Sequence, residues 1–458
     1  MKRKHNKQLS IWEMVGYGVG NCVGSGIFVY MGLAIGFTGR SVSIAMLLAS
    51  IAMLFAYAYN TLMVGTLPLS GGKYAQSAVL QPPLLAGVSA VTQIIKSIAT
   101  SGFAISIVQY LKIPFPQIAP YSSIIAFIIM SVFFATTLFG TKFMAKLNAI
   151  MVGVMVISLT VFIVAGLPQV HAGVFDFKAD DFFTGGPIGF ASAIAIMGIA
   201  CQGSNLLVAY ASEAKKPTRS IPIAILITTG IVGVLYLLIA VVAAGILPVD
   251  QVANQSLAVV ANELFSYPIF LVFVLGGACF AIATSLYATI SSLKYPILSA
   301  VDDGWFPKII GKKTKNGYPW VTMLITYLVG VIPILTGMKL DQIASYVMIP
   351  VMFLSMLNNV LFLKIPKQYP NAWKRSFFHM PMPALILIVI ISLLTDLLVC
   401  MAMFTTLDES DKIIVPLLMV IVFAYSFWRL KSGKVTMKSV EEARQHAMEE
   451  ISEMEENQ

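Results

Sequence analysis

Long apolar segments alternate with short polar ones along this chain of 458 residues. Twelve of the apolar segments hold the ~20 residues that a helix needs to cross about 30 Å of hydrocarbon. We therefore predict an all-α polytopic membrane protein with twelve transmembrane helices. The predicted spans are 10–37, 41–66, 83–111, 120–139, 143–167, 187–211, 221–247, 267–295, 319–337, 341–363, 382–405 and 413–430.

The first and the sixth predicted spans are interrupted by a similar short pattern. Residues 22–25 read Cys-Val-Gly-Ser, and residues 201–204 read Cys-Gln-Gly-Ser. A break inside a span frees backbone groups that lipid cannot satisfy, so such breaks line a cavity or hold a ligand. Small residues can also simply let helices pack closely. Two matching breaks in corresponding positions favour a binding site at the midplane of the bilayer.

The same two breaks predict an internal repeat. Five spans separate one break from the next, so the second unit starts from the opposite face of the membrane. We expect a first five-helix repeat at 1–167 and a second, inverted repeat at 187–363. Two further helices follow at 382–430, and an acidic tail with a short helix follows at 431–458.

Composition and charge support a membrane protein. Hydrophobic residues make up 58% and charged residues 11%, against roughly 45–50% and about 25% in soluble domains. The net charge of +9 raises the question of a nucleic-acid partner. If the N-terminus is cytoplasmic, however, 24 Lys and Arg fall in inner segments and 5 in outer loops. By the positive-inside rule we expect both termini in the cytoplasm, a plasma (inner) membrane location and no nucleic acid.

We expect neither catalysis nor a metal or other cofactor. The four histidines fall in termini or loops, and no nucleophile–base motif is present. The four cysteines lie within predicted spans, which indicates buried free thiols rather than a disulfide or a metal site. A channel is the closest physical competitor, but inverted broken helices fit a closed midplane site better than an open pore.

Four short motifs occur in order along the first two thirds of the chain. They are G-S-G-I-F at 24–28, P-x-S-G-G-x-Y at 68–74, E-x-x-x-P-x-R-x-I-P at 213–222 and A-x-x-D-G-x-x-P at 300–307. In these motifs the chain resembles the amino acid–polyamine–organocation transporters, which share the leucine-transporter-like fold. The resemblance implies a 5+5 inverted repeat with broken helices 1 and 6.

The resemblance also implies a permease that moves an amino acid or related amine by alternating access. Backbone N–H groups after each break can hold a carboxylate, and carbonyls before it can accept from an ammonium group. The implied substrate-binding residues are Asn21, Cys22, Val23, Gly24, Ser25, Gly26 and Ile27 in the first span and Ile199, Ala200, Cys201, Gln202, Gly203 and Ser204 in the sixth.

The chain departs from the family at two places. Members often carry a bulky aromatic gate about four residues before the glycine of span six, where this chain has Ile199. The pocket is therefore wider, gated elsewhere or suited to another cargo. The neighbouring Gln202 can contact substrate or bond a helix-end carbonyl. The span-five lysine of some proton-coupled relatives is absent, because Met155 occupies that position.

The coupling ion or counter-substrate stays open between a proton or sodium symporter and an exchanger. Ser291 and Ser292 are candidates for an ion site, unless their hydroxyls bond carbonyls of their own helix. Lys96 lies deep within a span, with Thr100 one turn on, and we hypothesise that this pocket charge is functional. It can accept a proton, repel cationic cargo, hold an anion, replace sodium or snorkel to an interface.

One acidic residue, Asp396, lies within the eleventh span, outside the repeat. We expect it to make a helix–helix or oligomer contact rather than to take part in transport. The same pattern of spans and breaks also fits a ligand sensor on a transporter scaffold, or a carrier of a non-amino-acid organic ion. The oligomeric state and any partner subunit are not predicted.

Overall fold

The computed structural model is built of helices. It describes residues 9–23, 26–67, 69, 72–139, 141–211, 214–315 and 317–456. No strand occurs among these residues, whose one isolated β-bridge joins Leu9 and Ala214. The predicted all-α class is therefore confirmed.

The helices follow the predicted apolar segments closely. Their bounds are α1 Ile11–Cys22, α2 Gly26–Thr38, α3 Val42–Ala56, α4 Ala58–Thr66, α5 Gly72–Leu80, α6 Pro83–Ile95, α7 Ala99–Leu111, α8 Ser122–Thr136, α9 Thr141–Gly166, α10 Gly186–Cys201, α11 Pro217–Gly245, α12 Val249–Val252, α13 Ala258–Leu264, α14 Tyr267–Val272, α15 Phe280–Asp302, α16 Trp320–Thr336, α17 Leu340–Phe362, α18 Ile365–Gln368, α19 Pro370–Arg375, α20 Met382–Thr405, α21 Asp411–Lys431 and α22 Lys438–Glu456. Two 3-10 segments, η2 Lys96–Ile98 and η6 Gln202–Tyr210, and the π segment η7 Phe273–Cys279 extend or join them.

Ten helical stretches of the described chain are long and apolar enough to cross a membrane. This number is lower than the twelve predicted spans because some helices are too short to be counted and two helices are joined into one stretch. α1 has only 12 residues, and α16 is apolar but has 17. α2 continues through a short 3-10 turn into α3, so these two helices form one stretch, Gly26–Ala56.

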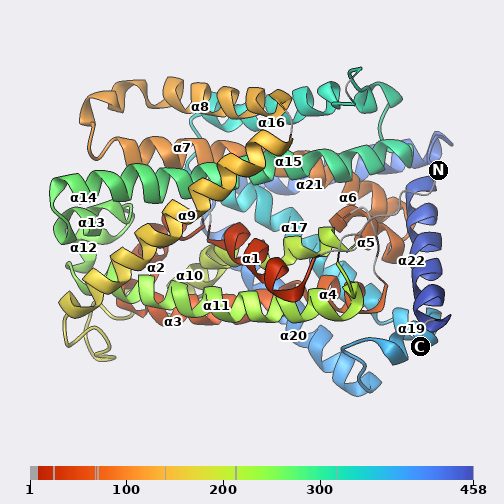
Figure 1. Cartoon of the computed structure of the whole chain (residues 1–458), viewed down its shortest axis with the longest axis horizontal. Helices are drawn as coiled ribbons and strands as arrows, with labels where there is room; N and C mark the ends of the chain where they lie inside the picture. The colour runs from red at the N-terminus through yellow and green to blue at the C-terminus, as the bar shows by residue number, and fades with distance from the viewer. Residues whose placement is uncertain are drawn as a thin grey trace.

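The longest helices lie alongside one another, and further helices lie at the two ends of the bundle (Figure 1). α5, α19 and α22 lie at one end, and α12, α13 and α14 lie at the other. Inside the bundle, α1 packs against η6 and α2 packs against α10. The two interrupted helices therefore lie side by side and run in opposite directions.

An additional helix interruption, which the sequence analysis did not predict, lies in the second apolar segment. α3 ends at Ala56 and α4 begins at Ala58, with Tyr57 between them. The Ala56 carbonyl accepts hydrogen bonds from the side chains of Ser355 and Asn359 in α17. Because these tertiary bonds satisfy the freed carbonyl, the break is stable inside a buried segment.

Candidate functional site

The two interrupted helices touch through their backbones at the breaks. A β-carbon placed on Gly26 would lie 2.2 Å from Cα of Ala200, and one on Gly203 would lie 2.4 Å from the backbone nitrogen of Cys22. Carbon atoms do not approach this closely, so only glycine fits at either position. The glycines of the two motifs therefore bring the ends of four half-helices together.

Side chains bond the carbonyls that the breaks leave free. The Cys201 carbonyl accepts from the Cys22 thiol at 3.9 Å and from the Ser204 hydroxyl at 3.4 Å. The Tyr236 hydroxyl of α11 donates to the Cys22 carbonyl at 2.5 Å. A carbonyl oxygen has two lone pairs, so the Cys22 oxygen, which accepts one of these bonds, keeps acceptor capacity for a bound group.

The predicted binding residues are mostly buried at this crossing. Cys22, Val23, Ile27, Ala200 and Cys201 are all at most 3% exposed. Asn21 and Ile199 are half-buried. Gly24 and Ser25 lie outside the described residues. The structure thus brings the described members of both motifs to one buried place.

Gln202 connects this place to a further helix. Its side-chain amide nitrogen lies 2.8 Å from the sulfur of Met348 in α17. The two contacts expected for Gln202, with substrate or with a helix-end carbonyl, stay predictions, because this nitrogen carries a second N–H group. Ser204 in turn accepts from Thr229 of α11 at 3.2 Å. Met348 and Thr229 were not predicted, because nothing in their own sequence neighbourhoods distinguishes them from packing residues.

Lys96 and Thr100 face different neighbours. The half-buried Lys96 donates to the Gln93 side chain at 3.1 Å. Thr100 is fully buried, and its hydroxyl bonds the Ser97 carbonyl and lies 3.9 Å from the sulfur of Met130 in α8. Thr100 therefore contributes to packing between α7 and α8, whereas Lys96 keeps a charge inside the bundle.

Lys73, at the start of α5, is one of the 24 Lys and Arg of the predicted cytoplasmic segments, and no further role was predicted for it. Its ammonium group lies 4.7 Å from the ring centroid of Tyr57, at the break between α3 and α4. Burial, and then the positive charge of Lys96, lower the pKa of Lys73 to about 7. No sequence periodicity marks this residue, because its environment comes from three separate segments.

The two serines of the possible ion site differ in environment. Ser291 is half-buried, whereas Ser292 is exposed and donates to the Thr289 carbonyl of its own helix at 2.9 Å. The hydroxyl of Ser292 thus makes a bond within its own helix, and the ion-site role of both serines stays a prediction, because a donating hydroxyl keeps oxygen lone pairs. In the described part of the chain, no group of three His, Cys, Asp or Glu side chains can hold a metal ion.

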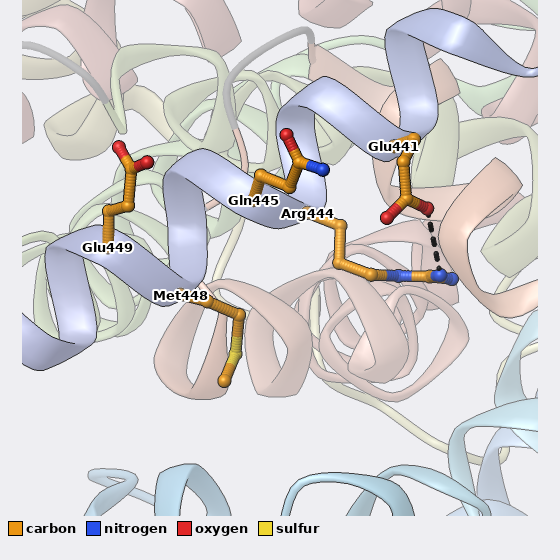
Figure 2. Close-up of a pocket in the computed structure, with 5 residues that line it drawn as sticks. All are labelled: Glu441, Arg444, Gln445, Met448 and Glu449. Atoms are coloured by element: carbon orange, nitrogen blue, oxygen red, sulfur yellow. Dashed lines mark hydrogen bonds and ion pairs between the residues drawn. The ribbon is translucent and has the colours of Figure 1, made fainter.

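An open hollow lies away from the helix breaks, on the tail helix α22. Figure 2 shows its lining, which comes from this one helix: Glu441, Arg444, Gln445, Met448 and Glu449. Arg444 and Glu441 form an ion pair of 3.2 Å there. Its position at the end of the bundle makes it a surface feature rather than a site within the membrane.

Comparison with known proteins identifies the family. A family model described as amino acid permease matches residues 9–425. An uncharacterized protein of Methanocaldococcus jannaschii is 28% identical over 318 residues, which is 67% of this chain and 72% of that protein. Cationic amino acid transporter 7, chloroplastic, of Arabidopsis thaliana is 26% identical over 344 residues, covering 66% of this chain and 56% of its own length.

A third relative covers more of both chains. The branched-chain amino acid permease BcaP of Bacillus subtilis is 24% identical over 401 residues, which is 80% of this chain and 82% of that protein. The family match and the ten apolar helical stretches agree on a multi-pass membrane transport protein. This chain belongs to the amino acid permease family.

Proposed function

We propose that this permease carries an amino acid or a related amine across the plasma membrane by alternating access. The observation that carries the proposal is the backbone contact between the two broken helices at Gly26 and Gly203. Helix ends that meet inside a membrane provide both N–H donors and carbonyl acceptors for a polar solute. A zwitterion needs both kinds of group.

In the proposed pocket the first turn of α2, from Gly26 to Phe28, holds the carboxylate of the cargo. The N-terminal end of a helix favours negative charge and offers unpaired N–H groups. The carbonyl of Cys22 accepts from the ammonium group. Ile199, Gln202 and Met348 then surround the side chain and select among cargoes.

We propose the leucine-transporter-like arrangement of twelve helices as the frame of this pocket. Contacts between elements support it, because α1 packs against α11 while α10 packs against α3. This is the exchange of partners expected when the units 1–167 and 187–363 are related by inversion. The helices in 382–430 then lie outside the repeat.

The orientation follows from charge. We propose that both termini are cytoplasmic, since Lys and Arg concentrate in the segments on that side of the predicted topology. The end of the bundle that carries α5, α19 and α22 then faces the cytoplasm, and the end with α12–α14 faces outward (Figure 1). A fluorescent-protein fusion at the C-terminus that is accessible from outside intact cells would contradict this orientation.

Cargo class is the least constrained part of the proposal. The relatives carry names that refer to cationic and to branched-chain amino acids, so we propose the shared α-amino and α-carboxyl groups as the recognised unit. Lys96 is proposed to line the inner path of the cargo, and Ser291 and Ser292 remain candidates for an ion site. Both symport and exchange are compatible with this pocket.

Counterflow tests the proposal directly. Purified protein in liposomes loaded with an unlabelled amino acid should take up the same labelled amino acid against its concentration difference. L-Leucine and L-lysine are the first two probes, after a thermal-shift screen of amino acids, amines and small organic anions. Gly16→Ala is the matched control for Gly26→Ala, because a β-carbon on Gly16 meets nothing within 4 Å.

Two different functions would give different outcomes in this assay. Saturable binding without any counterflow favours a ligand sensor on a transporter scaffold. Counterflow of organic anions or amines without counterflow of amino acids favours a carrier of a different organic ion. Absence of both binding and flux for every compound overturns the proposal.

A further inference from the structure

A carboxyl group is buried near the middle of α20 with little to compensate a charge. Asp396 is 0% exposed and lies within the 24-residue helix Met382–Thr405. One of its oxygens, Oδ2, accepts from the Asn359 side chain at 3.1 Å. The other oxygen, Oδ1, has no hydrogen-bond partner among the described residues. Acidic groups at membrane depth are rare and default to a functional hypothesis.

Asn359 connects this carboxyl group to the break in the second apolar segment. Its Oδ1 accepts from the Tyr59 backbone N–H at 3.1 Å, and its Nδ2 donates to the Ala56 carbonyl at 3.1 Å. The same nitrogen donates to Asp396. One amide thus bonds the end of α3, the start of α4 and the carboxyl group together.

The groups around Asp396 are neutral or weakly acidic. Tyr57 and Tyr59, from the α3–α4 break, and Cys400, one turn along α20, lie close enough to interact with it electrostatically. α17 contributes the Asn359 amide and Ser355, and its own ionisable residues, Asp341 and Tyr346, lie in its first two turns. α10 carries one titratable side chain, Cys201, at its far end.

Within the part of the chain that the structure describes, no cation compensates the carboxyl group. No described Lys, Arg or His forms an ion pair with Asp396. The ammonium group of Lys73 lies on the ring face of Tyr57, 4.7 Å from its centroid. The hydroxyl of the same Tyr57 is buried and lacks a hydrogen-bond partner in the described structure. A buried carboxylate needs a paired charge or several donors, and the side chains of α17 that face Asp396, Asn359 and Ser355, are both neutral.

We propose that Asp396 binds the proton that this carrier moves together with its cargo. The proposal rests on the transport function proposed above and adds its coupling ion. In the conformation described here Asp396 is a neutral carboxylic acid. When the α3–α4 break rearranges and water reaches Oδ1, the acid gives its proton to that water and becomes a carboxylate. On the other side of the membrane, the carboxylate takes a proton from water.

The coupling follows from thermodynamic linkage. A group that holds a proton in one conformation and loses it in another makes the balance of conformations depend on the proton gradient. Asn359 supplies the physical connection, because it bonds the carboxyl group and both sides of the break. Asp396→Asn keeps a similar shape, but it can neither bind nor release a proton.

An infrared measurement tests proton binding without any cargo. Protonated and ionised carboxyl groups absorb at different frequencies, so purified protein in liposomes should show a band from a buried protonated acid. We expect this band to be absent in Asp396→Asn and retained in Ser392→Ala. Ser392 is an apt control, because it is buried one turn earlier on α20 and bonds its own helix at 2.8 Å. An identical acid band in wild type and Asp396→Asn would overturn the proposal.

A transport measurement tests coupling. With the membrane potential clamped, an inward gradient of two pH units can drive up to about a hundredfold accumulation of zwitterionic L-leucine with one proton. We expect the ratio of gradient-driven accumulation to counterflow to fall at least tenfold in Asp396→Asn. Ser392→Ala should keep the wild-type ratio. If both activities fall equally, or if a sodium gradient alone drives uptake, Asp396 is not the coupling site.

The infrared and the transport measurements together distinguish failure of this proposal from failure of the transport function on which it rests. If wild-type protein shows no counterflow with any amino acid, the transport function fails while the infrared result still decides whether Asp396 holds a proton. If Asp396→Asn does not fold, Asp396→Glu retains a proton-binding group. We then expect retained accumulation with a shifted pH dependence, and an unchanged pH dependence would contradict the proposal.

Discussion

The hydroxyl of Tyr236 in α11 bonds the backbone carbonyl of Cys22, the last residue of α1. This carbonyl is free because α1 stops inside the membrane instead of continuing into α2. Tyr236 is fully buried, so the bond is shielded from water. The Tyr236 hydroxyl therefore fixes the position of the Cys22 carbonyl, which is a backbone acceptor on one side of the proposed pocket.

Removing this hydroxyl should weaken both folding and transport. Tyr236→Phe leaves a buried carbonyl with one partner fewer, which costs about 1–3 kcal/mol. We expect a lower melting temperature in detergent and a higher apparent KM in counterflow. Tyr121→Phe, at a position 60% exposed, is the control and should change neither quantity. If the two variants have the same melting temperature and the same apparent KM, the bond contributes neither to stability nor to transport.

A methyl group at either crossing glycine should disrupt the bundle. Gly203→Ala places a carbon 2.4 Å from the Cys22 nitrogen and 2.5 Å from the Asn21 carbonyl carbon, so the backbone must move. We expect Gly26→Ala and Gly203→Ala to lose counterflow and most of the monodisperse protein after purification. Gly230→Ala, where a β-carbon meets nothing within 4 Å, should behave as wild type. Active, stable Gly203→Ala protein would refute the close crossing.

Lys73 should make stability depend on pH. Its pKa is about 7 in the folded protein, where burial and the charge of Lys96 lower it from the ordinary value of 10.5. Between these pH values the unfolded chain binds a proton that the folded chain lacks, so this group makes stability rise with pH. Below about pH 7 both states bind the proton, and the destabilisation is complete.

Substitutions of Lys73 and of Lys96 isolate the contribution of Lys73 to the pH dependence of stability. Thermal unfolding in detergent at about pH 7 and about pH 10 should show a smaller rise for Lys73→Met than for wild type. Lys96→Met removes the neighbouring charge, so the pKa of Lys73 should move back towards its ordinary range. Lys178→Met, at an exposed loop position, is the control. If the pH profiles of wild type and Lys73→Met coincide, Lys73 is not perturbed.

The tail helix should detach when Asp303 loses its charge. The buried Asp303 carboxylate accepts from the Tyr74 hydroxyl at 2.6 Å and from the Ser439 backbone N–H at 2.5 Å. Next to it, Gly304 has a φ of 87°, and a β-carbon placed on it would lie 2.0 Å from the Lys434 carbonyl oxygen. We expect Asp303→Asn to speed trypsin cleavage around Lys434 about tenfold, since each 1.4 kcal/mol changes an open population by that factor. Asp302→Asn, at the adjacent exposed position, should leave the cleavage rate unchanged.

The sequence was sufficient to locate the helices and the two main breaks. Apolar length identified the spans, and the glycine-containing motifs marked α1 and α10 as interrupted. These features are local, because hydrophobicity and glycine act at the position where they occur. The paired motifs predicted a site at the two breaks, but they did not predict which residues meet there, such as Gly26 and Ala200.

Features that depend on distant partners could not be predicted. Tyr57 looks like an ordinary residue of an apolar helix, but Ser355 and Asn359 break the helix there by bonding the Ala56 carbonyl. Asp396 was expected to make a helix–helix contact, and its bond to Asn359 is one. The proximity of that contact to the break, however, depends on how α3, α17 and α20 fold together.

The chain also suits site-directed labelling. Cys22, Cys201 and Cys279 are buried and Cys400 is only partly exposed, so water-soluble thiol reagents should react slowly with the native protein. Because Asp303 bonds both α5 and α22, fluorophores on cysteines introduced into those two helices would report whether the segments separate. Such a probe pair would report separation of the two helices in real time while leaving every residue of the membrane interior untouched.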